Sequence, residues 1–175
     1  MRWTDHGPNP RGRVVGHALL IPCLWMAGCA STGEIPARPE SAEEVRALYL
    51  SGIEAFNAHD LDRFVEQFAE DIRMYTPTGW LDGKAAVRDR FAQTFQRFPT
   101  VRMEIEDLVV RSVTSDAVLV DFRWRVHPRG TGPAFHGVGS GVYVRRDGRW
   151  VEVLEHETVV RTDPELMAPP ANGGP

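Results

Sequence analysis

Apolar and polar residues alternate with a period of two over the second half of the chain. Between residues 117 and 127 the apolar positions are Val118, Val120, Phe122, Trp124 and Val126. The alternate positions from 121 onward are held by Asp121, Arg123, Arg125 and His127. This alternation predicts an antiparallel strand with one buried face and one polar face. We predict further strands over 101–111, 134–145 and 149–160, and Asp147-Gly148 predicts a type I′ hairpin turn between the last two.

Apolar residues in the first half recur every three or four positions instead, which predicts helices. The helices are expected over 41–56, 61–68 and 83–98, and Asp60 is placed to cap the second. A short strand over 72–76 lies between the second and third helices. The predicted fold class is therefore α+β, with three N-terminal helices packed on a curved antiparallel β-sheet in one domain over 41–162.

The two ends of the chain have a different character. Residues 1–28 combine a basic start with a short apolar run, and Met26-Ala27-Gly28-Cys29 resembles the bacterial lipobox. This pattern predicts export and membrane anchoring through lipidation of Cys29, at the outer membrane or periplasmic face of a Gram-negative cell. An ordinary secretory signal is the alternative. Residues 29–40 are expected to form a flexible tether and 163–175 a disordered tail.

Composition excludes some function classes and leaves others open. The chain has 20 basic and 24 acidic residues, with no clustered basic face, so no nucleic-acid partner is expected. His156-Glu157 begins like the HExxH zinc motif, but Val160 stands where the second histidine is needed. The glycine-rich run 137–141 has no helix after it, which argues against a phosphate loop. We therefore expect neither a metal nor a cofactor.

Five short stretches carry a family resemblance. They are Phe56-Asn57-Ala58-His59-Asp60-Leu61-Asp62, Phe68-Ala69-Glu70-Asp71, Pro77-Thr78-Gly79, Gly83-Lys84-Ala85-Ala86-Val87 and Asp147-Gly148-Arg149-Trp150. Together they resemble the NTF2-like superfamily, in particular its SnoaL-like and DUF4440-type branches. The resemblance implies a cone in which a curved sheet wraps a long helix and leaves a pocket at one end. It implies little about activity, because the superfamily hosts enzymes, binders and scaffolds.

Comparison with the ketosteroid isomerases of this superfamily implies an orientation for the pocket. The positions of the isomerase base and its two oxyanion donors are held here by Thr76, Gly52 and Ser140, so the same isomerase chemistry is not expected. The match does place Ser140 toward the pocket. Strand parity would then place His136 and Val138 on the same side, facing Phe122 and Trp124.

The predicted site follows from that orientation. Candidate catalytic residues are His136, Glu155 and His156, the last of them only if a bulge reverses its strand. The expected pocket lining is Tyr49, Phe56, Trp80, Phe122, Trp124, Val138, Ser140, Val153 and Glu157. Desolvation would raise the pKa of a carboxyl group facing such a pocket and make it a candidate acid or base.

Three functions fit these observations. We expect a domain that binds a small, largely apolar molecule in the cone. The first alternative is a cofactor-independent acid/base enzyme of the cyclase, dehydratase or isomerase kind, for which two convergent titratable groups are needed. The second is a dimerisation module with a filled cone. Asp121, Arg123 and Arg125 on the polar sheet face predict salt-bridged ladders there or a homodimer interface.

Overall fold

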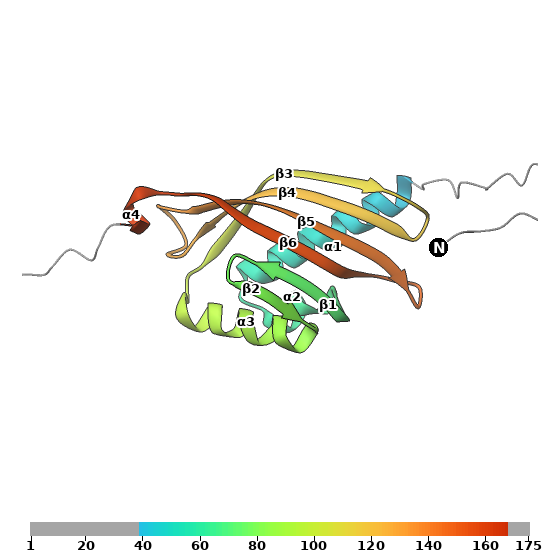
Figure 1. Ribbon diagram of the computed structural model, residues 1–175, viewed down its shortest axis with the longest axis horizontal. Helices are drawn as coiled ribbons and strands as arrows, with labels where there is room; N and C mark the ends of the chain where they lie inside the picture. The colour runs from blue at the N-terminus through green and yellow to red at the C-terminus, as the bar shows by residue number, and fades with distance from the viewer. Residues whose placement is uncertain (1–38, 168–175) are drawn as a thin grey trace, which may run out of the picture. The chain divides into compact units, whose positions relative to one another are not determined.

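The computed structural model describes residues 39–167, which form four helices and six strands. In chain order the elements are α1 (Pro39–Asn57), α2 (Leu61–Glu66), β1 (Phe68–Thr76), β2 (Gly79–Asp82), α3 (Lys84–Arg97), β3 (Arg102–Ser112), β4 (Ala117–His127), β5 (Phe135–Arg146), β6 (Arg149–Thr162) and α4 (Pro164–Met167). Within these residues no helix is long and apolar enough to cross a bilayer. The fold is the predicted α+β arrangement of helices on a curved sheet (Figure 1).

The strands form one sheet in the order β2-β1-β6-β5-β4-β3. Four strands in sequence, β3 to β6, pair as an antiparallel meander, as the alternation predicted. The first strand differs from expectation, since β1 pairs with β6 in parallel and β2 adds a short antiparallel edge. The sheet is therefore mixed. After β1 and β2 the chain passes through α3 to the far edge of the sheet at β3, and the meander then places β6 beside β1.

Local chemistry explains where the helices begin and end. The side chain of Asp60 accepts a hydrogen bond of 3.1 Å from the backbone N–H of Arg63, so it caps α2 as predicted. The first helix begins at Pro39, two residues before the predicted start, and Ser41 lies inside it. The Ser41 hydroxyl donates to the carbonyl of Ser115 (3.3 Å) and ties this end of α1 to the β3–β4 loop. The helix α1 lies along one face of the sheet (Figure 1).

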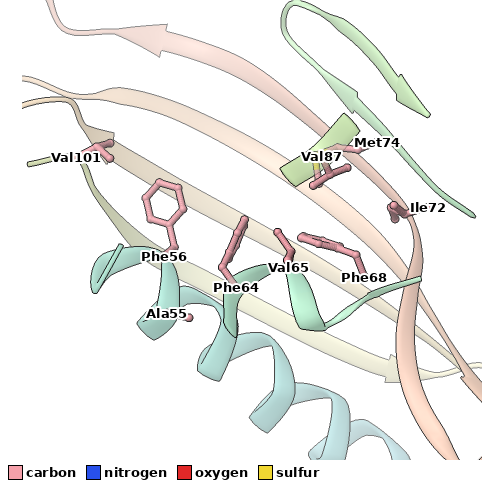
Figure 2. Packing of buried hydrophobic residues seen from close by; sticks show 9 residues of the cluster. All are labelled: Ala55, Phe56, Phe64, Val65, Phe68, Ile72, Met74, Val87 and Val101. Carbon is pink, nitrogen blue, oxygen red and sulfur yellow. The ribbon is translucent and has the colours of Figure 1, made fainter. Parts of the chain in front are cut away.

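Two apolar clusters fill the space between helices and sheet. The first joins α1, α2, α3 and β1 and consists of Ala55, Phe56, Phe64, Val65, Phe68, Ile72, Met74, Val87 and Val101 (Figure 2). The second joins α1 to the meander and consists of Val45, Tyr49, Val118, Val120, Phe122, Trp124 and Tyr143. Because α1 contributes to both clusters, it fixes the meander relative to the smaller β1–β2 hairpin.

Glycines occupy the inner face of β5, which corrects the predicted parity of that strand. A Cβ at Gly137 would overlap the Trp124 ring, and a Cβ at Gly139 would overlap the Phe122 ring. The large side chains of β4 therefore lie flat across β5, where the missing Cβ atoms leave room for them. Side chains of the opposite parity, Val138 among them, face outward, and Val138 is 39% exposed.

Three β-bulges interrupt the ladders of the meander, and one of them leaves Val160 of β6 without a partner on β5. In β6, Glu152 pairs with Tyr143 and Leu154 pairs with Val142, so the intervening Val153 has no partner. In β3, Ile105 and Asp107 pair with consecutive residues of β4, so Glu106 is the extra residue. A bulge changes which residues share a face of the strand. The bulge at Val153 thus separates the two buried positions Glu152 and Glu155 by three residues instead of two.

The end of β6 is more ordered than the predicted tail beginning at 163. Asp163 accepts hydrogen bonds from the backbone N–H of Ala134 (2.9 Å) and lies 3.0 Å from Nε2 of His136. The short helix α4 follows at once. The predicted signal sequence, the tether up to 38 and the remainder of the tail from 168 lie outside the described residues.

Candidate functional site

Three glutamates on β6 face the interior of the domain. Glu152 is 1% exposed and Glu155 is 8% exposed, whereas Glu157 lies half-buried farther along the strand. The register sets Glu155 opposite Gly141 and Glu157 opposite Gly139, so the side chains rise over the glycine-lined part of β5. A row of carboxyl groups on a buried strand face is costly unless each is neutral or paired.

The innermost carboxyl has well-defined partners. The Tyr143 hydroxyl lies 2.9 Å from Oε2 of Glu152 and 3.0 Å from Oε1 of Gln67, and all three side chains are buried. No hydrogen bond of good geometry reaches Oε1 of Glu152. A Cβ at Gly141 would overlap that oxygen, so glycine at this position is what gives the carboxyl its space. Glu155 is close enough for its carboxyl to affect the pKa of Glu152 through a hydrogen bond.

Burial raises the pKa of all three carboxyl groups. Desolvation raises the pKa of Glu152 to about 8 and outweighs the effect of the hydrogen bonds that link Glu152 to Tyr143 and Glu155. Desolvation raises the pKa of Glu155 well above its usual value, and the charges of Glu152 and Glu157 raise it further. The same burial and the same carboxylates raise the pKa values of Tyr49 and Tyr143. The interior therefore favours neutral acids, with few charges present at once.

Glu157 is the outermost carboxyl and differs from the other two. Desolvation raises its pKa to about 7, while the positive charge of Arg90 on α3 lowers it. An acid with a pKa near neutrality exists in both protonation states at physiological pH, which suits a general base. The half-buried position of Glu157 also leaves part of its side chain accessible, unlike that of Glu152.

Aromatic side chains surround the carboxyl row. The rings of Tyr49 on α1 and Phe122 on β4 lie 5.1 Å apart, and both residues are buried. Trp124 is 5% exposed, and its indole N–H has no hydrogen-bond partner. A buried donor without a partner costs free energy, roughly 1–3 kcal/mol. An acceptor atom placed beside the indole N–H would remove this cost.

The structure brings five of the predicted site residues together: Tyr49, Phe122, Trp124, Glu155 and Glu157. It separates the other predicted lining residues from them. Phe56 belongs to the first apolar cluster, with α2 and α3 (Figure 2). Trp80 is 52% exposed and its ring lies tilted against that of Tyr75, and Val153 is the half-buried bulge residue.

The three predicted site residues of β5 are not in the interior either. Val138 and Ser140 are exposed and line a hollow of about 380 Å³ on the outer face of the sheet. His136 is held by Asp163 at 3.0 Å and by Arg161 near the end of the strand. The prediction placed Ser140 inward from the isomerase comparison and extended this by parity, whereas the glycines face inward, because Phe122 and Trp124 occupy the space above them.

His156 also faces outward, and the outer hollow contains no catalytic triad. Its Nε2 lies 3.2 Å from the Thr158 hydroxyl, and its ring lies 5.1 Å from that of Tyr75. Register places Ser140 opposite His156 and Asp121 opposite Ser140, so the serine separates the acid from the imidazole. A serine nucleophile needs the imidazole between hydroxyl and carboxylate. Asp121 is instead paired with Arg111 at 3.2 Å.

The predicted ladders of charge lie on this outer face. Arg123 pairs with Asp107 at 3.7 Å, and Arg125 pairs with Glu104 at 3.1 Å and Glu106 at 2.8 Å. Exposed pairs of this kind contribute little stability, about 0–1 kcal/mol each. Within residues 39–167, no group of three or more histidine, cysteine or acidic side chains has the geometry of a metal site.

Sequence reasoning missed the innermost part of the site, namely Glu152, Tyr143 and Gln67. One pattern could have revealed it: Phe135, the three glycines and Tyr143 all share one parity, so a tyrosine and a phenylalanine bracket the glycine row. Reading that parity as inward would have placed Tyr143 in the core. The bulge that turns Glu152 inward has no comparable signature in the sequence.

Comparison with known families and structures gives a consistent picture. The model of the SnoaL-like domain matches residues 49–153. An NTF2-like protein of unknown function from Pseudomonas putida KT2440 is similar in structure, with a TM-score of 0.66 and 19% identity, over 80% of this chain and 100% of that one. The LinA-type3 hexachlorocyclohexane dehydrochlorinase of Novosphingobium barchaimii LL02 has a TM-score of 0.61 and 16% identity, over 71% of this chain and 89% of that one. Comparison with curated proteins gives no match.

Proposed function

This chain belongs to the SnoaL-like domain family, and on that premise we propose that it is an enzyme that moves protons without a cofactor. Its substrate would be a small, largely apolar molecule. The observation that carries the proposal is the convergence of Glu155 and Glu157 on one aromatic-lined interior, beside Tyr49. A protein that only binds an apolar ligand gains nothing from buried acids, which cost free energy to desolvate.

The two outer carboxyl groups of the row suit different roles. Glu157, with a pKa of about 7, is the general base that takes a proton from a carbon next to a carbonyl group. Glu155 is kept neutral by burial and is the acid that protonates an oxygen. In a dehydration, the C–H electron pair forms the new double bond, and the hydroxyl leaves as water with the Glu155 proton. In an isomerisation, Glu157 returns its proton to another carbon.

The surroundings favour a substrate with an oxygen acceptor on an apolar body. The unpartnered indole N–H of Trp124 can hold a carbonyl oxygen, and Phe122 with Tyr49 can contact the hydrocarbon part. A solved structure with the same fold is named as a dehydrochlorinase, a name that denotes elimination. The fold likeness is compatible with elimination, and the argument for this chain comes from the carboxyl pair.

Solvent exchange tests the proposal directly. The apolar ketone 2-tetralone, incubated with the protein in D₂O at pH 7.5, should gain deuterium next to its carbonyl group, as followed by NMR. Glu157→Gln should slow this exchange by at least ~100-fold, because the amide cannot accept the proton. Glu165→Gln changes an exposed carboxyl in α4 and is the control. Exchange at equal rates with wild type and Glu157→Gln protein would contradict the proposal.

We also propose that the enzyme is exported and held at a membrane by lipid on Cys29, which lies outside the described residues. The support is the basic start, the short apolar run and Ala27-Gly28-Cys29. Cys29→Ala should move the protein from the membrane fraction to an unprocessed or soluble form. Cell fractionation followed by mass determination of the N-terminal peptide checks this, and a soluble wild-type protein would refute it.

We propose a homodimer through the outer face of the sheet. Val109 and Val138 are 50% and 39% exposed there, and they lie among oppositely charged side chains such as Asp121 and Arg123. Exposed apolar groups among complementary charges are typical of interfaces. Light scattering at micromolar concentration should give the mass of a dimer, and Val138→Arg should reduce it to that of a monomer. A monomeric wild-type protein would rule the dimer out.

A further inference from the structure

Glu152 takes no part in the proposed chemistry, yet it is the most deeply buried acid of the row. Its partners show where its proton must be. The Gln67 amide donates from Nε2 to the carbonyl of Phe64 (3.2 Å), which turns Oε1 toward Tyr143. An amide oxygen can only accept hydrogen bonds, so the Tyr143 hydroxyl donates its single proton to Gln67.

The Tyr143 oxygen then has only acceptor capacity left for Glu152. Its distance of 2.9 Å from Oε2 of Glu152 is that of a hydrogen bond, and one proton must lie between the two oxygens. Because the tyrosine proton is already committed to Gln67, the proton in this second bond belongs to Glu152. With Glu152 ionised, the single tyrosine proton would have to serve both contacts, so one of the two oxygens, Gln67 Oε1 or Glu152 Oε2, would face the tyrosine oxygen without a hydrogen.

The chain of hydrogen bonds has one direction and begins at Glu155. A protonated Glu152 that donates through Oε2 presents Oε1 as an acceptor, and Oε1 has no well-formed partner of its own. The neighbouring Glu155 carboxyl is the group that can donate to it. The sequence of donors is then Glu155 to Glu152, Glu152 to Tyr143, Tyr143 to Gln67, and Gln67 to the Phe64 carbonyl.

We propose that Glu152 is a positioning residue that stays protonated at neutral pH and holds the proton of Glu155 on that acid until a substrate oxygen competes for it. The inference rests on the proposed function for its purpose, although the proton positions can be measured without a substrate. Three features of the fold serve this arrangement: the bulge at Val153, the missing side chain of Gly141 and the close approach of Gln67 to Gly52.

The groups around the pair are consistent with this assignment. From α1 the neighbour is Tyr49, and from β5 it is Tyr143. Along β6 it is Glu157, whose pKa is lowered by the charge of Arg90 on α3. The residues paired with Glu152 and Glu155 on β1 are Phe68 and Met74, which carry no charge. No described cation stands among the causes that shift the pKa of Glu152 or Glu155.

Infrared difference spectroscopy of the full protein tests the assignment. At pH 7 the spectrum should contain a protonated-carboxyl C=O band that Glu152→Gln removes, while the variant stays folded, because glutamine has the same donor and acceptor as the neutral acid. A band unchanged by Glu152→Gln would mean that Glu152 is ionised in the wild type, and would overturn the proposal. Since no ketone is needed, this outcome is independent of the deuterium-exchange result.

A second variant tests the direction of the chain. Gln67→Met removes the acceptor for Tyr143, so the tyrosine proton becomes available to Glu152 and should lower its titration midpoint by about one pH unit. Gln93→Met makes the same change at an exposed position in α3 and should leave the midpoint of Glu152 in place. The midpoint can be followed by ¹³C NMR of labelled glutamate. An unchanged midpoint in Gln67→Met would refute the role of the chain.

Discussion

The folded domain should lose several kcal/mol of stability as the pH rises from 5 to 8. Burial raises the folded-state pKa of Glu152 to about 8 and that of Glu157 to about 7, and it raises that of Glu155 as well. In the unfolded chain these acids lose their protons near pH 4.5. Between the two values the unfolded state binds fewer protons than the folded state, so each acid lowers the free energy of unfolding as pH rises, by up to ~1.4 kcal/mol per pH unit.

The acids with lowered pKa values act in a different window. Asp71, Glu44 and Asp163 are stabilised as carboxylates, so their contribution is lost only as the pH falls toward their folded pKa values. Maximal stability is therefore expected near pH 5. Urea unfolding at pH 5, 6, 7 and 8 measures the trend.

Glu152→Gln removes one of the three buried acids, so its free energy of unfolding should fall less between pH 5 and 8 than that of the wild type. The variant should be more stable than the wild type at pH 8. Glu43→Gln makes the same chemical change at an exposed position of α1 and serves as its control. A wild-type stability that is constant or rises between pH 5 and 8 would mean that the buried acids are not neutral in the folded state.

Gly137→Ala should destabilise the domain by about 3 kcal/mol or more. The added Cβ would overlap the Trp124 ring and lie 2.6 Å from the carbonyl oxygen of Thr158, which belongs to the backbone of β6 and cannot move without breaking the ladder. Overpacking of a well-filled core costs roughly 1–3 kcal/mol, and here a strand must shift as well. Thermal and urea unfolding of the purified variant measure the loss.

Val138→Arg is the matched comparison, since it changes the next residue of the same strand. Its side chain faces outward and is 39% exposed, so a change below about 1 kcal/mol in the stability of the protomer is expected. The sequence-based parity implies the opposite outcome, since it places Val138 in the pocket, where an arginine would not fit. A stable Gly137→Ala together with an unfolded Val138→Arg would restore the original parity.

Much of the fold could be predicted from the sequence because its patterns are local. The alternation in β4, the Asp147-Gly148 turn and the Asp60 cap each depend on a few adjacent residues, and each is present in the structure. Both central turn residues have positive φ, as a type I′ turn requires. The parallel pairing of β1 with β6 could not be predicted in this way, since it joins residues about 80 positions apart.

The site was only partly predictable for a related reason. Parity along β6 placed Glu155 and Glu157 on the same face as each other, and the structure has them inward. Parity along β5 failed because the isomerase comparison at Ser140 was used to choose the inner face, whereas the inner positions are glycines under the rings of Phe122 and Trp124. Glu152 was missed because the bulge at Val153 shifts the alternation by one residue.

The bulge at Glu106 bears on how the protein behaves at high concentration. The strand β3 is the long open edge of the sheet, and the backbone groups on the side that does not face β4 would invite a second chain to add a strand. Glu106 interrupts the regular spacing of that edge, and its carboxylate binds Arg125 at 2.8 Å. Charged residues at Arg102, Glu104 and Asp107 continue along it. A foreign strand would have to match an irregular, charged backbone, so this edge resists fibrous self-assembly.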